Sequence, residues 1–239
     1  MGSLAARRRG RGAAHDSTIG RLVRHLSFSD PGEGLRILAI GAHPDDIEIG
    51  CGGTILGLIA DGLVTSVRWV VCSGTATRAQ EARAGAAAIV EGVADREIVI
   101  GAGRDGYFLL EGAAIKDWFE DLKRGPEPDL ILTHRRDDRH QDHRFISDLT
   151  WQTFRSSLIL EYEIPKYDGD LANPNVFVEV PERIMRRKIE VLETSFASQV
   201  DRHWYDSGTF TAIMRLRGVE SRSTSGYAEA FEGRKLILR

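Results

Sequence analysis

The chain has 239 residues, a length that suits one large domain or a domain with a small appendage. Of these residues 42% are hydrophobic and 28% charged, as is ordinary for a soluble globular protein. A formal net charge of −3 gives no global reason to expect nucleic acid or an acidic membrane as a partner. No stretch approaches the roughly 20 apolar residues of a membrane span, which argues against integral membrane association.

The first 33 residues are polar and rich in glycine and arginine, and we expect them to form a flexible N-terminal segment. Within them, residues 18–26 favour a short helix. The basic cluster at residues 6–12 is not followed by an apolar segment, so it does not indicate a signal peptide. We expect residues 34–239 to form a single domain.

From residue 35 onwards, continuous apolar runs alternate with helical patterns. Strands are predicted at residues 35–42, 65–74, 96–101, 128–134 and 157–165, and helices at residues 52–62, 78–92, 113–125 and about 140–156. This alternation predicts an α/β fold, a Rossmann-like three-layer α/β/α arrangement with a mainly parallel sheet. The last third predicts a small extension with a strand at 175–180, a helix at 181–194 and a strand at 209–218.

The two cysteines show neither a disulfide framework nor the spacing of a metal site. Cys51 lies among glycines and Cys72 ends an apolar strand, so we expect both to be buried thiols. A reduced cytoplasm is the simplest compartment for such a chain.

Two polar clusters follow the first and fourth predicted strands. His43, Asp45 and Asp46 come directly after the first strand, and residues 133–144 contain three histidines and three aspartates. Because parallel strands open a crevice at their carboxyl ends, topology would bring the two clusters together. A simpler interpretation is that the aspartates cap the following helix and that the second cluster is a solvated helix start.

Together the clusters offer enough nitrogen and oxygen donors for a divalent metal. His140 and His143 are three residues apart, so a helical turn places them on neighbouring faces. Two histidines and one carboxylate suit a catalytic zinc, which keeps one position open. A dinucleotide site is disfavoured, because the first cluster lacks GxGxxG and its carboxylates would repel a pyrophosphate.

These residues resemble a known family. The segment AHPDD-x-E-x-GCGGT, followed at a distance by H-x-D-H, is similar to the PIG-L/LmbE-like superfamily of zinc-dependent de-N-acetylases that act on N-acetylglucosaminyl compounds. The resemblance extends from about residue 35 to 231. It is supported by RAQE at 78–81, DG at 105–106, SQ at 198–199 and AEAF at 228–231. Gln141 stands where the family often has proline.

The resemblance implies a role for each matching residue. It makes His43, Asp46 and His143 the metal ligands and Asp45 the general base. His140 would be a cation that stabilises the oxyanion or protonates the amine.

Three further roles are implied. Asp142 would orient the His140 imidazole, and Arg78 and Asp105 would bind the substrate. For Arg78, pairing with Glu81 on its own helix is an alternative of nearly equal weight. His134, Asp137 and Asp138 are expected to shape the loop and not to bind metal.

The implied activity is hydrolysis of an N-acetylglucosaminyl small molecule to acetate and a free amine, in natural-product or low-molecular-weight thiol biosynthesis. One Zn²⁺ is the expected cofactor, with Fe²⁺ or Co²⁺ as alternatives. We expect an amino-sugar substrate, no nucleic acid partner and a cytoplasmic location. The sequence leaves open whether the protein is a homo-oligomer. It also leaves open an amidase for a larger acyl or cysteinyl group, or a non-catalytic sugar-binding module.

Overall fold

The computed structural model describes residues 34–236. The predictions for the N-terminal 33 residues, their flexibility, basic cluster and short helix, lie outside this part of the chain. The described residues form a seven-stranded sheet in the order β3-β2-β1-β4-β5-β7-β6. The strands are β1 (Leu35–Gly41), β2 (Val64–Ser73), β3 (Asp95–Gly103), β4 (Leu130–His134), β5 (Leu158–Tyr162), β6 (Val176–Glu179) and β7 (Ala228–Gly233).

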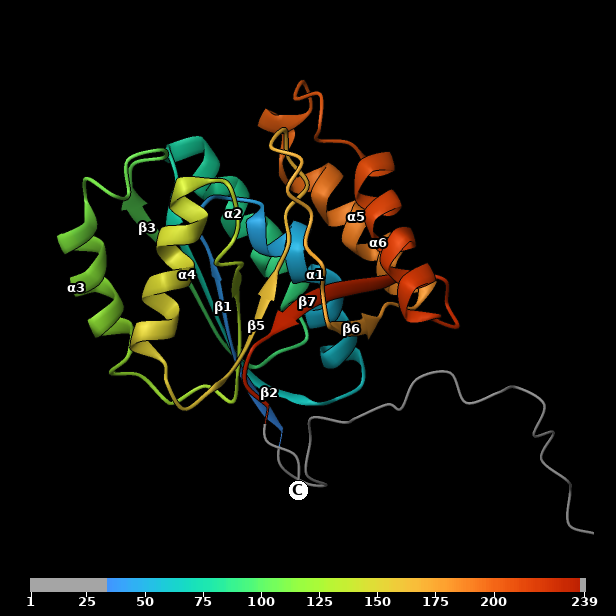
Figure 1. The fold of residues 1–239 in the computed structure, drawn as a ribbon, viewed down its shortest axis with the longest axis horizontal. Coiled ribbons are helices and arrows are strands. Elements are labelled where there is room, and N and C mark those ends of the chain that lie inside the picture. Colours follow the sequence, from blue (N-terminus) through green and yellow to red (C-terminus); the bar gives the residue numbers. More distant parts are fainter. Residues whose placement is uncertain (1–33, 237–239) are drawn as a thin grey trace, which may run out of the picture.

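Strands β1 to β5 are all parallel, and β7 runs antiparallel between β5 and β6. The predicted α/β class with a mainly parallel sheet is therefore confirmed. The chain proceeds outward from β1 to β2 and β3, then returns to the other side of β1 for β4 and β5. At such a switch point a parallel sheet leaves a crevice at the carboxyl ends of its strands, which point to the top of Figure 1.

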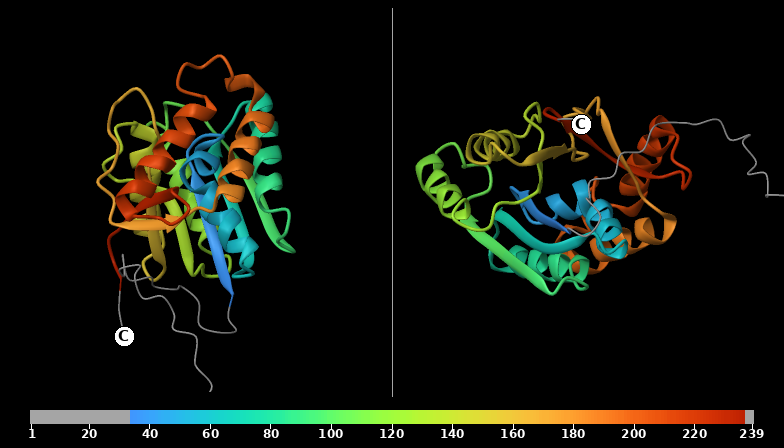
Figure 2. Two further views of the ribbon diagram at one scale, coloured as in Figure 1. Left: turned by 90° about the vertical axis from the view of Figure 1, so that its right-hand side faces the viewer. Right: turned by 90° about the horizontal axis from the view of Figure 1, so that it is seen from below.

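Helices cover both faces of the sheet (Figures 1 and 2). Side chains of α1, α2 and α5 form one core with the sheet, and side chains of α3 and α4 form another. β1 contributes to both cores in alternation, with Ile37 and Ala39 on one face and Leu38 and Ile40 on the other. The helices are α1 (Asp46–Ala60), α2 (Ala76–Ile89), α3 (Gly112–Leu122), α4 (Gln141–Thr153), α5 (Glu182–Ser195) and α6 (Ser207–Ser221), with a 3₁₀ turn η1 (Ala197–Gln199).

Helix α1 begins six residues earlier than predicted, at Asp46. The glycines at positions 50, 52 and 53 disfavour a helix by propensity, but tertiary contacts select one. A Cβ atom at Gly50 would collide with the Tyr162 ring, so glycine permits the close approach of α1 to the sheet. As a result, the first polar cluster lies at the N-terminus of this helix.

The prediction of a strand at residues 209–218 is wrong, because this segment lies within helix α6. Asp206 caps the helix by accepting a hydrogen bond from the Thr209 amide at 3.0 Å. The buried residues of α6 fall on one helical face, at positions i, i+4, i+7 and i+8: Phe210, Met214, Arg217 and Gly218. The seventh strand of the sheet is instead β7, at the residues noted only as a family motif.

Strand β7 also ties α1 to α5 through a buried ion pair. Glu229 accepts hydrogen bonds from the Gly53 and Thr54 amides at 2.8 and 2.6 Å, and lies 2.7 Å from Lys188 Nζ. Lys188 in turn donates to the Ile49 carbonyl at 2.6 Å. The AEAF motif therefore holds the helix whose first residue is Asp46.

Both cysteines are buried free thiols, as predicted. Across residues 34–236, no helix combines the length and the apolar character that crossing a membrane requires.

Candidate metal-dependent active site

A cleft of about 780 Å³ opens at the switch point between β1 and β4. Its walls come from the loop after β1, the start of α2, the loop after β3 and the start of α4. The loop after β5 and the segment around η1 complete it. A volume in this range holds a ligand larger than a single small anion. Both polar clusters of the sequence line this cleft.

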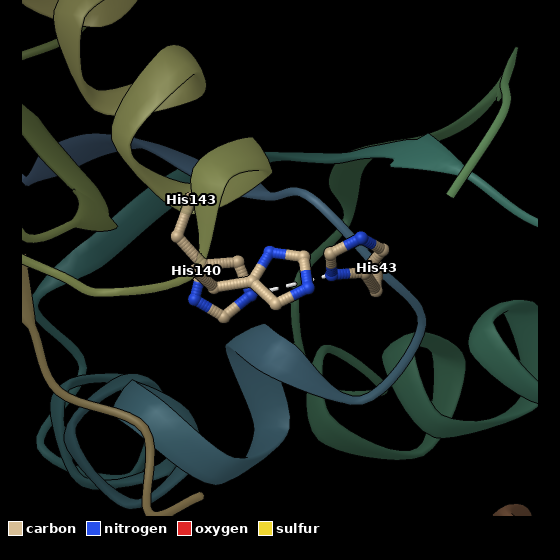
Figure 3. A group of neighbouring side chains, drawn as sticks. All are labelled: His43, His140 and His143. Atoms are coloured by element: carbon tan, nitrogen blue, oxygen red, sulfur yellow. Dashed lines mark hydrogen bonds between the residues drawn. The ribbon is translucent and has the colours of Figure 1, made fainter. Parts of the chain in front are cut away.

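The three predicted metal ligands meet at the base of the cleft. His43 Nδ1 lies 3.2 Å from His143 Nε2 and 3.5 Å from an Asp46 carboxylate oxygen. The other Asp46 oxygen lies 3.6 Å from His143 Nε2. Figure 3 shows that His43 reaches this point from the loop after β1, whereas His143 and His140 come from the start of α4.

Each candidate ligand histidine has an inner ring nitrogen, which points at the other candidate ligands, and an outer ring nitrogen, which points away from them. The outer nitrogen of each faces at least one carboxylate. His43 Nε2 lies 3.2 Å from Asp142 and 3.1 Å from Asp105, and His143 Nδ1 lies 3.1 Å from Asp138. Each outer nitrogen therefore carries the hydrogen, which leaves the two inner nitrogens as lone-pair donors. Two lone pairs beside a carboxylate, 3.2 Å apart, are a donor set that fits a divalent cation.

The charge balance of the site also favours a cation. Burial lowers the pKa of His43, but hydrogen bonds to Asp105, Asp142 and Asp46 outweigh it and raise that pKa well above the ordinary value. Burial raises the pKa of Asp46, but its neighbours His143 and His134 outweigh that effect and hold the pKa well below its usual range. The site thus stabilises positive charge between the ligands, whether a proton or a metal supplies it.

Three combinations of side chains around this point bring three ligand atoms within 4.8 Å of one another. They share His43, Asp46 or His143 with the predicted set and add one or two neighbours. His134 is fully buried and stacks on His143 with ring centroids 3.9 Å apart, so it closes the side of the site that faces the sheet. The combinations are His43–His140–His143, Asp46–His134–His143 and His43–Asp105–Asp142.

Asp45 does not cap helix α1 in the manner of a simple N-cap aspartate. Its backbone is left-handed, with φ 91°, and its side chain makes no capping hydrogen bond. A non-glycine residue in this region costs on the order of 1–3 kcal/mol and persists only when its surroundings fix it. The carboxylate instead accepts a hydrogen bond from Arg78 at 2.8 Å.

The environment of Asp45 suits a group that accepts protons. Burial raises its pKa to about 7, with Arg78 opposing and Asp46 reinforcing the shift. A base with a pKa near 7 is well matched to proton transfer at neutral pH. Asp45 lines the cleft beside the candidate ligands without being one of them.

His140 precedes α4 as its N-cap residue, and its Nδ1 accepts a hydrogen bond from the Asp142 amide at 3.3 Å. The other ring nitrogen, Nε2, therefore carries the hydrogen. Burial and the neighbouring His43 lower the pKa of His140. The lowered pKa disfavours the expected imidazolium form of His140. The hydrogen bond to Nδ1 instead fits a neutral imidazole that has one N–H to donate.

The predicted contact of Asp142 with the His140 ring is corrected by the structure. The Asp142 carboxylate contacts His43 and accepts hydrogen bonds from the Gly106 and Phe108 amides at 2.6 and 3.3 Å. The Asp142 side chain therefore points toward the loop after β3. Only its backbone amide reaches His140.

Asp138 and Lys166 make contacts in the site that the sequence did not predict. Asp138 was expected only to shape its loop, yet it supports His143 and accepts a hydrogen bond from Lys166 Nζ at 3.0 Å. Asp138 lies five residues before the candidate ligand His143, and this spacing could have indicated that it supports that histidine. Lys166 lies on the loop after β5, and nothing in the sequence pattern indicated it.

The two residues predicted to bind substrate both line the cleft. Asp105 is mostly exposed, and one of its oxygens lies 3.1 Å from His43 Nε2. Arg78 donates to the Pro44 carbonyl at 2.5 Å, to Asp45 and to Glu81 at 3.0 Å. The alternative pairing of Arg78 with Glu81 is therefore present, together with a contact to the predicted base.

Comparison with known proteins connects this geometry to one family. Residues 38–154 match the PIG-L family, described as GlcNAc-PI de-N-acetylase. The match includes both polar clusters, RAQE at 78–81 and DG at 105–106, whereas the motifs at 198–199 and 228–231 lie beyond it.

Solved structures share the fold at low identity. N,N'-diacetylchitobiose deacetylase from Pyrococcus horikoshii is similar with a TM-score of 0.64 and 20% identity, over 83% of each chain. The zinc-inhibited form of a teicoplanin deacetylase gives 0.60 and 15%, over 83% of this chain and 97% of that one. The 4-carboxy-2-hydroxymuconate hydratase of Pseudomonas putida gives 0.62 and 16%, over 86% and 98%. The fold therefore carries more than one chemistry, and the site must decide between them.

Proposed function

Residues 38–154 form a PIG-L family domain, and on that premise we propose that the protein is a metal-dependent hydrolase that removes the acetyl group from an N-acetylglucosaminyl small molecule. The products are acetate and the free amine. The observation that carries the proposal is the convergence of His43, Asp46 and His143 on one point, with the unligated Asp45 beside them.

The donor set suits zinc, with Fe²⁺ or Co²⁺ as alternatives, because two imidazoles and one carboxylate bind all three ions. When bound, the ion polarises the amide carbonyl and lowers the pKa of water toward 7. His43 and His143 hold the coordinating nitrogens toward it because carboxylates fix their opposite edges.

Asp45 takes the proton from the water that attacks the acetyl carbon. Arg78 holds one carboxylate oxygen, so the other remains to accept that proton. The carbon–nitrogen bond of the tetrahedral intermediate then breaks, and the leaving amine receives a proton as acetate departs. The proton held on Asp45 balances this step.

His140 donates its Nε2–H to the oxygen that becomes negative in the tetrahedral intermediate. The hydrogen bond from the Asp142 amide to Nδ1 fixes the tautomer in which this donor exists. A neutral donor replaces the imidazolium that the family resemblance implied, since burial and His43 lower the pKa of His140.

The family resemblance suggests the setting. We propose an amino-sugar intermediate of natural-product or low-molecular-weight thiol biosynthesis as the substrate and the cytoplasm as the location. We also propose that residues 34–239 act as one domain, which the presence of β6 and β7 in the same sheet as β1 supports.

The test is metal analysis combined with a substrate panel. We expect the purified protein to bind about one divalent ion and to release amine from some of a set of N-acetylglucosaminyl compounds with different reducing-end groups. His143→Ala should lose both the metal and the activity. A protein that neither binds metal nor releases amine after zinc is added would contradict the proposal.

The cleft volume of about 780 Å³ keeps a second candidate in the test, an amidase for a larger acyl group. Matched substrates carrying either acetyl or a bulky acyl group on the same amine separate the two. Faster release of acetate supports the deacetylase, and faster release of the bulky acid supports the amidase.

A further inference from the structure

We propose that Glu81 and Ser198 are positioning residues that act through Arg78 on the Asp45 carboxylate. This inference rests on the proposed function, in which Asp45 is the general base. It gives a physical role to two sequence motifs that lie far apart in the chain, RAQE at 78–81 and SQ at 198–199. Neither residue touches the candidate metal ligands.

The network is a continuous series of short hydrogen bonds. Arg78 Nη2 donates to Asp45 Oδ2 at 2.8 Å and to the Pro44 carbonyl at 2.5 Å, and Nη1 donates to Glu81 Oε2 at 3.0 Å. Glu81 then accepts from the Ser198 amide at 2.8 Å and from the Ser198 hydroxyl at 2.7 Å. Both Glu81 oxygens are therefore occupied, which fixes the carboxylate and through it the guanidinium.

Asp45 depends on this network for its orientation. Its left-handed backbone turns the side chain away from the amides of α1, and no capping hydrogen bond holds it. Among residues 34–236, Arg78 is the side chain that donates a hydrogen bond to this carboxylate. Arg78 and Glu81 are 17% and 11% exposed, so water competes little for their contacts.

The network also joins two segments of the cleft wall that lie far apart in the sequence. Arg78 lies at the start of α2, and Ser198 lies in η1, next to the cleft residue Gln199. The guanidinium is packed 5.6 Å from the ring centre of Phe196, which precedes η1. A residue bound on both sides in this way is restrained before any substrate arrives, as a positioning residue must be.

This arrangement predicts a different kinetic signature from simple substrate binding. If Arg78 only held substrate, loosening it would raise KM and leave kcat unchanged. If it orients the base, loosening it lowers kcat with little change in KM. Glu81→Gln is the informative variant, because a carboxamide has one oxygen for three donors and its NH₂ group must face one of them.

We expect Glu81→Gln to lower kcat by about 10- to 100-fold with KM within about twofold of the wild type. Ser198→Ala should give a smaller loss in kcat, and Ser198→Thr, which keeps the hydroxyl donor, should restore it. The matched control is Glu190→Gln on α5, which breaks an Arg187–Glu190 pair of the same i, i+3 spacing at 2.9 Å. This control should leave both constants unchanged. A raised KM with unchanged kcat in Glu81→Gln, or no change in either, would overturn the inference.

A second measurement does not depend on activity. The unfolding free energies of metal-free wild type, Asp45→Asn, Glu81→Gln and the double variant form a cycle between two residues that are joined through Arg78. A non-additive result supports the network, and an additive one overturns it. If no substrate is deacetylated by the wild type, the proposed function fails while the cycle still decides whether Glu81 positions Asp45.

Discussion

Each imidazole of the candidate metal site has carboxylate on the edge that faces away from the metal position. Asp142 and Asp105 stand behind His43, and Asp138 stands behind His143. Such contacts fix the tautomer and the ring plane and make the inner nitrogen a stronger donor. Asp138 and Asp142 are both fully buried and held by further contacts, Asp138 by Lys166 and Asp142 by the amides of Gly106 and Phe108, whereas Asp105 is mostly exposed.

Removing either supporting carboxylate should weaken metal binding without removing a ligand. We expect Asp138→Asn and Asp142→Asn each to reduce zinc affinity by about 10- to 100-fold, measured by competition with a chelator of known affinity. Asp148→Asn, an exposed aspartate on the same helix as Asp142, is the control and should bind like the wild type. Wild-type affinity in both test variants would mean that these contacts do not tune the site.

Asp45 is expected to separate binding from turnover. Asp45→Asn removes the proton acceptor but keeps the size of the side chain and leaves His43, Asp46 and His143 in place. We expect a full complement of metal by elemental analysis and a kcat lower by about 10²- to 10⁴-fold. Activity near that of the wild type would exclude Asp45 as the base.

The sequence located the site but not all of its contacts. That the two polar clusters meet could be predicted because the ends of neighbouring parallel strands lie together, whichever loops follow. The choice of His43, Asp46 and His143 as metal ligands came from the family resemblance. The partner of Asp142 could not be predicted, since it depends on how the loop after β3 places its amides against the start of α4. Lys166 could not be found either, because its contact with Asp138 spans 28 residues and requires the loop after β5 to fold back.

At the scale of elements, two glycines of helix α1 have the same low helix propensity but different surroundings. Gly50 lies against the Tyr162 ring, whereas nothing lies within 4 Å of a Cβ built at Gly57. The helix therefore has room for a side chain at position 57 and none at position 50. Local propensity alone placed the start of this helix six residues too late, because it cannot detect such packing.

These two glycines form a matched pair of variants. Gly50→Ala should lower the free energy of unfolding by about 1–3 kcal/mol because it overpacks the contact with the sheet. Gly57→Ala should raise it by about 0.5–1 kcal/mol through helix propensity. Denaturant unfolding of the metal-free protein measures both, and equal effects of the two substitutions would contradict the packing described here.

The sequence pattern gave the wrong secondary structure for helix α6. Residues 209–218 contain alternating apolar positions and two threonines, which favoured a strand. The burial of Phe210, Met214 and Gly218 follows a helical period instead, and the Asp206 cap specifies the start. Buried Arg217 hides part of this period from a hydrophobicity count, because its partner Glu163 becomes visible only in the fold.

At the scale of the whole molecule, the buried groups of the candidate metal site also make the free energy of unfolding depend on pH. Burial lowers the pKa of His143 from 6.5 to about 3, with His134 contributing. The unfolded chain therefore binds a proton that the folded chain excludes. The resulting stability is fully present above a pH of about 6.5 and is lost as the pH falls toward 3. Asp45 acts oppositely, because its raised pKa of about 7 favours the fold at low pH and costs stability as the pH rises through 7.

For the metal-free protein we expect the loss of unfolding free energy between pH about 7 and about 4 to be smaller in His143→Gln than in the wild type. His203→Gln, at an exposed histidine, serves as the control and should follow the wild-type profile. Identical profiles for the wild type and His143→Gln would show that His143 does not contribute to the pH dependence of the free energy of unfolding.

The place of β7 in the sheet has a consequence for synthesis on the ribosome. β5 emerges about seventy residues before the strand that pairs with its free edge, since β7 spans residues 228–233. Until then Lys188 lacks Glu229, and the amides of Gly53 and Thr54 lack their acceptor. A chain folding as it is made therefore carries an open sheet edge and an incompletely clamped α1 until residues 228–233 appear. The helix that bears Asp46 is therefore made well before the strand that secures it.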